Sequence, residues 1–61
     1  MARTEQHGDY VAVEGKLSKD DSRSAYVTKT FPDGARRPVA SFWYYEEAVR
    51  WAKEHAALEE A

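Results

Sequence analysis

Hydrophobic and polar positions follow a strand-like pattern in three short stretches of this chain. The first is the β-branched and aromatic run Tyr10–Glu14, which ends at Gly15. The second spans residues 25–31 and the third residues 36–43. Between the first two, residues 18–23 have turn composition and no apolar period, which predicts an exposed loop. The pattern therefore indicates three β-strands.

The second and third strands are joined by the strongest local signal in the chain, Phe31-Pro32-Asp33-Gly34-Ala35. Proline presets φ for the first turn position, and glycine accepts the positive φ needed at the last. The segment predicts a hairpin with a three-residue loop, in which Phe31 pairs with Ala35. This register places three further pairs opposite each other: Lys29 with Arg37, Val27 with Val39, and Tyr26 with Ala40.

From Tyr44 onward the apolar period changes from two to about 3.6, which is typical of an amphipathic helix. Glu46 and Glu47 suit the positive end of its dipole, and the helix is expected from Tyr45 to near Glu59. The predicted fold is α+β, a three-stranded antiparallel β-meander with one C-terminal helix on one face (β-β-β-α). Residues 1–8 are polar and aperiodic and are expected to be a mobile tail, with residues 9–61 forming a single domain.

One short helix can cover only one face of this sheet. The register assigns Tyr26, Thr28, Pro38, Ala40 and Phe42 to one face, and Val27, Lys29, Phe31, Arg37, Val39 and Trp43 to the other. The uncovered face then exposes apolar groups beside cations, a composition that usually marks an interaction site. The alternatives are cover by the first strand or tail, twisting of the sheet, or a homodimer. The predicted partner-binding residues are Trp43, Val39, Phe31, Lys29, Arg37 and Tyr44.

Composition adds limits on location and chemistry. The chain has 61 residues, which allows one small core, and no Cys, which excludes disulfides and thiolate metal sites and favours a cytoplasmic protein. No apolar run reaches the length of a membrane span, so no membrane contact is expected. The net charge of −2 argues against a generic polyanion binder. The acids concentrate in the helix, whereas the strands are slightly basic.

Catalytic and metal-binding patterns are weak. His7 falls in the predicted tail, and His55 falls on the apolar side of the helix, where a packed imidazole is the more frequent role. His55 and Glu59 have the i, i+4 spacing of metal ligands, but two ligands without a third are a weak signal. We therefore expect a protein that is not an enzyme and that has no catalytic residues, cofactor or metal.

Part of the chain resembles the arm-type DNA-binding domain of tyrosine-type phage integrases and related small stand-alone phage and bacterial proteins. The resemblance rests on four segments: 26–34, Ser41-Phe42, Glu46-Glu47-Ala48 and Trp51-Ala52. It implies that a three-stranded sheet enters the DNA major groove while the helix covers its back. By the same resemblance, Phe42 faces the helix and Trp43 faces outward.

The chain departs from that family at two points. Tyr44 stands where the family usually has Thr or Ser to cap the helix, and the sheet has few cations for phosphate contacts. Trp43, Tyr44, Tyr45 and Trp51 gather around the strand-to-helix junction, and Tyr and Trp are enriched at protein interface hot spots, although they also fill cores.

The predicted function is a small protein-binding module. Its size and charge are similar to those of phage or mobile-element proteins that block a host factor, for example inhibitors of CRISPR defence. The expected partner is a host protein or nucleoprotein complex. The alternative is DNA binding through the sheet.

Overall fold

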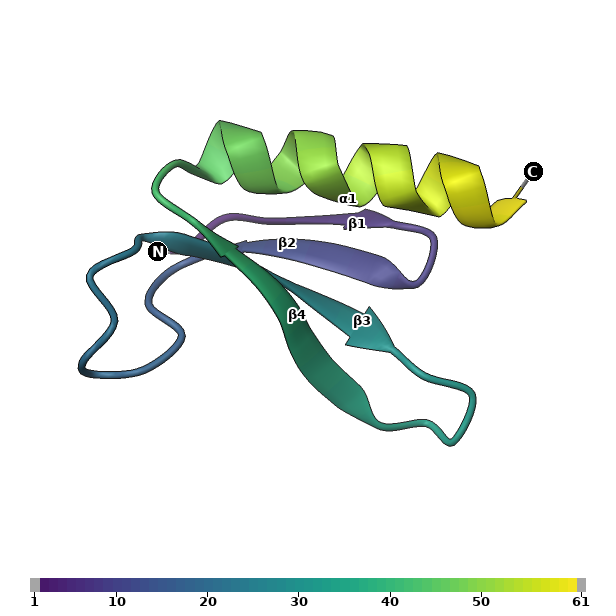
Figure 1. The fold of residues 1–61 in the computed structure, drawn as a ribbon, viewed down its shortest axis with the longest axis horizontal. Coiled ribbons are helices and arrows are strands. Elements are labelled where there is room, and N and C mark those ends of the chain that lie inside the picture. The colour runs from purple at the N-terminus through teal and green to yellow at the C-terminus, as the bar shows by residue number, and fades with distance from the viewer. Residues whose placement is uncertain (1, 61) are drawn as a thin grey trace.

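The computed structural model describes residues 2–60 and contains four strands and one helix. Its elements, in chain order, are β1 (Thr4–His7), β2 (Tyr10–Glu14), β3 (Ala25–Thr30), β4 (Arg36–Phe42) and α1 (Tyr45–Glu60). The strands form one antiparallel meander in the order β1-β2-β3-β4. Figure 1 shows α1 lying along one face of this sheet, while β4 slants away from the helix. The α+β class and the C-terminal helix are therefore confirmed, but the sheet has one more strand than predicted.

The additional strand is β1, in the segment that was expected to be a tail. Each of its four residues pairs with β2, from Thr4 opposite Val13 to His7 opposite Tyr10. The turn between the two strands is Gly8-Asp9, and Gly8 has a φ of 59°, a conformation that few other residues adopt readily. β1 has no apolar alternation because it is a polar edge strand, so the hydrophobic pattern did not reveal it.

The hairpin between β3 and β4 forms as predicted at its tip. The amide of Phe31 donates to the carbonyl of Ala35 and the amide of Gly34 to the carbonyl of Phe31, both at 2.8 Å. Lys29 lies opposite Arg37, as expected. Further along, a β-bulge leaves Val39 without a partner. Beyond it the predicted pairs are wrong, because Val27 lies opposite Ala40 and Tyr26 opposite Ser41.

This bulge also corrects the predicted division of the two faces. A one-residue shift in register moves side chains to the other side of a sheet. Val27 and Phe42, which the sequence assigned to opposite faces, therefore both lie on the helix side of the sheet. Val27 is completely buried there. Phe42 packs against the core and Trp43 is exposed.

The core between the sheet and α1 is small. Its buried residues are Tyr10, Ala12, Ala25, Val27, Ala48 and Ala52. Four of the six are alanines, so the helix and the sheet can approach closely, but each alanine buries little apolar surface. Val27 is the largest side chain that is almost completely buried. Half-buried aromatic residues around the rim, including Phe42, Tyr45 and Trp51, complete the packing.

A polar cluster fastens the C-terminal end of α1 to the sheet. The hydroxyl of Tyr10 donates to the carboxylate of Glu59, and the ammonium of Lys29 lies 3.0 Å from the same oxygen. These bonds lower the pKa of Glu59, through Tyr10 first and Lys29 second. At the other end of the helix, the guanidinium of Arg3 lies 4.5 Å from the ring centre of Tyr45 and forms an ion pair with Glu14.

Candidate partner-binding patch at the strand-to-helix junction

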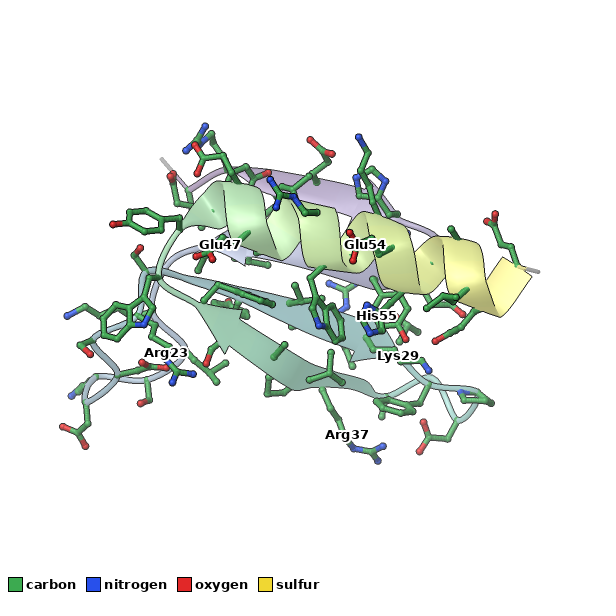
Figure 2. The ribbon with its side chains drawn as sticks, turned by 45° about the horizontal axis from the view of Figure 1, so that its top comes forward. Arg23, Lys29, Arg37, Glu47, Glu54 and His55 are labelled. Carbon is green, nitrogen blue, oxygen red and sulfur yellow. The ribbon has the colours of Figure 1, made fainter. Side chains whose placement is uncertain are left out.

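The six predicted partner-binding residues fall into two groups. Trp43 and Tyr44 follow the C-terminal end of β4, whereas Phe31, Lys29 and Arg37 lie at the hairpin end. Val39 lies between them at the bulge. Because β4 has seven residues, the two groups are separated by about 20 Å. Figure 2 shows the corresponding separation of Arg23 and Arg37 at the two ends of β4.

The cations at the hairpin end are engaged within the molecule. Lys29 bonds Glu59, which raises the pKa of the lysine, and its ammonium lies 5.3 Å from the ring centres of both Tyr10 and Phe31. Arg37 forms an ion pair of 3.3 Å with Asp33 and lies 5.1 Å from the ring centre of Phe31. These contacts hold the hairpin and the helix end together, so this group has a structural role.

The junction group is different because its aromatic side chains are left in solvent. Trp43 is 55% exposed and Tyr44 is 68% exposed, whereas the six other aromatic side chains are buried or half-buried. The structure therefore divides the aromatic residues that cluster in the sequence at this junction. Tyr45 and Trp51 pack against the core, and Trp43 and Tyr44 remain exposed to solvent.

Arg23, which is not among the six predicted partner-binding residues, lies beside Trp43. Its guanidinium lies 5.8 Å from the centre of the Trp43 ring and donates to the hydroxyl of Ser41 at 2.7 Å. The loop that carries Arg23 is itself held in place, since the Arg23 amide donates to Asp21 at 2.9 Å and the Ser24 hydroxyl donates to the carbonyl of Trp43. We call Arg23, Trp43 and Tyr44 the junction patch.

Tyr44 occupies the N-cap position of α1. Its carbonyl accepts the first helical bonds, from the amides of Glu47 at 3.2 Å and Ala48 at 3.4 Å. N-cap residues are usually Ser, Thr, Asp or Asn, whose short side chains accept a bond from the amides of the first turn. The tyrosine hydroxyl lies too far from its own backbone to do this. The junction patch thus includes a residue that does not suit its local position, a deviation often found at functional sites.

The remaining candidates from the sequence are part of the packing. His55 stacks on Trp51, and its Nδ1 lies 2.9 Å from the carbonyl of Trp51, while Glu59 is bonded to Tyr10 and Lys29. Two shallow hollows of about 240 and 270 Å³ adjoin Glu59. Across residues 2–60, no three His, Asp or Glu side chains lie where they could share a metal ion.

In the part of the chain that the structure describes, no helix is long and apolar enough to cross a membrane. No family model, curated protein or solved structure matches this chain. The resemblance to the integrase arm-type domain therefore stays a prediction from the residues that carry it.

Proposed function

We propose that this chain is a non-enzymatic protein-binding module and that the junction patch is its main contact with the partner. The observation that supports this proposal is the exposure of two adjacent aromatic side chains, Trp43 and Tyr44, next to an arginine that fixes one of them. Trp, Tyr and Arg are the residue types most enriched at protein interface hot spots. Because hydrogen bonds already hold Arg23 and the backbone of Trp43 before a partner arrives, less conformational entropy is lost on binding.

The charges around the patch favour a partner with an acidic group. The guanidinium of Arg23 forms no ion pair with any residue in 2–60 and donates there only to a neutral hydroxyl. This group can therefore donate two parallel hydrogen bonds to a carboxylate of the partner. In keeping with the size and charge of the chain, we propose that the partner is a host protein or nucleoprotein complex and that this domain blocks it. An inhibitor of CRISPR defence is one example of such a protein.

DNA binding through the sheet is less well supported by the arrangement of charges. On the face of the sheet turned away from α1, the alternation of the strands places Arg36, and the guanidinium of Arg23 reaches Ser41 on the same face, so few cations are available there. Binding to duplex DNA depends on several neutralised phosphates and weakens steeply with salt. Titration of random duplex DNA at low salt tests this alternative, and tight, salt-sensitive binding would favour it over the protein-binding proposal.

Tyr44→Ser gives the sharpest test of the junction patch. A serine at this N-cap position can accept a bond from the first-turn amides, so we expect stability to rise by about 1 kcal/mol. We expect capture of the partner to fall in the same variant, because the exposed ring is lost. A loss of binding in a more stable protein cannot be ascribed to unfolding. Unchanged capture by this variant and by Trp43→Ala would exclude the patch as the contact.

Trp43→Ala and Leu58→Ala form a matched pair for pull-down from a host lysate. Leu58 is 71% exposed, near the C-terminal end of α1 and remote from the junction. Removal of the Trp43 side chain is expected to weaken binding by about 2 kcal/mol or more, the usual effect of an aromatic hot spot. The Leu58 variant is expected to retain the same partner. If Leu58→Ala loses the partner and Trp43→Ala retains it, the interface lies on the helix.

A further inference from the structure

The face of the sheet turned away from α1, which we call the outer face, is almost free of charge. Cross-strand pairing arranges its side chains in two rows, Thr4-Val13-Tyr26-Ser41 and Gln6-Val11-Thr28-Pro38. None of these eight residues is charged in a chain of which 33% is Asp, Glu, Lys or Arg. Two cations border these rows: Arg36, opposite Thr30, at the hairpin end, and Arg23, whose guanidinium donates to the Ser41 hydroxyl, at the other end. The helix side of the same strands carries Glu5, Glu14, Lys29 and Arg37.

The centre of the outer face is only half-buried. Val11, Val13, Tyr26 and Thr28 all retain intermediate exposure, although they lie on the two inner strands. Figure 1 shows α1 on the other side of the sheet, and no other helix or strand within residues 2–60 covers this face. Depletion of charge, with aliphatic and aromatic residues at the centre, is the composition of the buried part of a protein interface.

The small core indicates which partner this face needs. Domains of this size commonly depend on a disulfide, a metal or oligomerisation for stability, since a single small core contributes little. The chain has no cysteine, and its core consists largely of alanines. Burial of a second apolar face would add stability at protein concentrations where the copies associate.

We propose that the outer face binds the outer face of a second copy of this chain. The two central rows carry no charge and can meet their own copy without like-charge repulsion, while the cations Arg36 and Arg23 lie at opposite ends of β4. Two twisted sheets that pack face to face, about 10 Å apart, are a common arrangement of β-proteins. The proposed dimer is thus a four-layer assembly with sheets inside and helices outside. The junction patch borders the outer face at one corner, where Arg23 donates to Ser41, and serves the heterologous partner of the proposed function.

The size of the face predicts a weak, reversible dimer. Four strands about 4.8 Å apart, with about five residues of length each at about 3.4 Å per residue, give a footprint of about 19 by 17 Å, or roughly 300 Å² for each copy. Both copies together bury less than the about 1,200 Å² typical of a stable specific complex. Association is therefore expected between about 10 µM and 1 mM protein, the range of small transient interfaces.

The valine methyl groups provide an internal control for this proposal in NMR spectra. Val11 and Val13 lie on the outer face, whereas Val27 and Val49 pack on the helix side. On dilution of the full chain over the concentration range above, the Val11 and Val13 resonances are expected to shift together along one monomer–dimer isotherm. The Val27 and Val49 resonances are expected to stay in place. Shifts confined to residues outside the outer face, or no shift at all, would overturn the proposal.

Sedimentation velocity on charge variants gives a second test. Val11→Lys places an ammonium at the centre of the outer face and is expected to weaken self-association at least tenfold. Leu58→Lys adds the same charge at an exposed site on α1 and is expected to leave it unchanged. A wild-type chain that sediments as a monomer throughout, or equal association of both variants, would show that the outer face does not join two copies. A variant that has lost its circular dichroism spectrum is replaced by Thr28→Lys, which adds the charge on the neighbouring strand.

Discussion

The indole ring of Trp51 and the imidazole ring of His55, one helical turn apart on α1, are stacked with their centres 3.7 Å apart and their planes inclined by 19°. The same indole meets the edge of Tyr10 at 5.5 Å and Phe42 at 6.2 Å between centroids. Trp51 is therefore the residue through which α1, β2 and β4 share one aromatic cluster. In a core composed mainly of alanines, this cluster supplies much of the buried apolar area.

Trp51→Ala is accordingly expected to be the most destabilising aromatic substitution in the chain. Truncation of a buried Phe or Trp costs about 3 to 5 kcal/mol. Trp51 and Phe42 are both half-buried, so we expect a loss of about 3 kcal/mol for Trp51→Ala and about 2 kcal/mol for Phe42→Ala. Urea unfolding followed by circular dichroism measures both values. A greater loss for Phe42→Ala than for Trp51→Ala would contradict the central role of the indole.

The hairpin loop gives a prediction that depends on backbone conformation alone. Gly34 has a φ of 87°, and a Cβ built on it would meet no atom within 4 Å. Gly34→Val is expected to cost more than about 1 kcal/mol because β-branched residues are strained at positive φ. Gly34→Asn is the matched control, since asparagine tolerates this region better. Equal denaturation midpoints for the two variants would contradict this explanation.

The elements that the sequence predicted are those specified by local chemistry. Pro32, Asp33 and Gly34 specify the hairpin, and the 3.6-residue period specifies α1. The bulge at Val39 depends on how β3 and β4 pair with each other, and the hydrophobic pattern of one strand alone does not predict it. Pro38 was the available signal, because prolines within sheets are confined to edge strands and bulges. Gly8-Asp9 was the corresponding signal for β1, as a dipeptide typical of tight hairpins.

The candidate site could be predicted only in part for a related reason. The residue types at 43 and 44 indicated an interface, and the structure leaves both side chains exposed. Arg23 precedes Trp43 by 20 residues, and only the pairing of β3 with β4 brings its loop to the junction. The cations at 29 and 37 looked free in the sequence because their partners, Glu59 and Asp33, are identified only by the folded arrangement.

The bonds to Glu59 predict a pH dependence with a definite sign. Tyr10 and Lys29 lower the pKa of this carboxyl below its ordinary value of 4.5, so the folded state favours the ionised form. The stability that results is fully present above the unfolded value and is lost as the pH falls through the folded one. The melting temperature of Glu59→Gln should therefore lie furthest below that of the wild type above about pH 4.5. The difference between the two melting temperatures should shrink as the pH falls.

Glu60→Gln is the matched control for this pH dependence. Glu60 is the next residue in α1, is exposed, and forms no ion pair within the described residues. For Glu60→Gln, the difference in melting temperature from the wild type is expected to be nearly independent of pH. A Glu59→Gln profile that runs parallel to the wild type from neutral pH into acid would show that this carboxylate does not fasten the helix.

Thr28 gives the last prediction, because its hydroxyl oxygen is buried and has no hydrogen-bond partner in residues 2–60. A buried polar atom without a partner costs about 1 to 3 kcal/mol. Thr28→Val keeps the β-branched shape and removes this oxygen, so we expect stability to rise by about 1 kcal/mol. Thr30→Val, two residues along β3, makes the same chemical change without an orphaned oxygen and is expected to remain within about 0.5 kcal/mol of wild type. Both are compared by urea unfolding at low micromolar concentration, where self-association through the outer face contributes little. Equal gains in the two variants would mean that strand propensity, and not the hydroxyl at position 28, accounts for the effect.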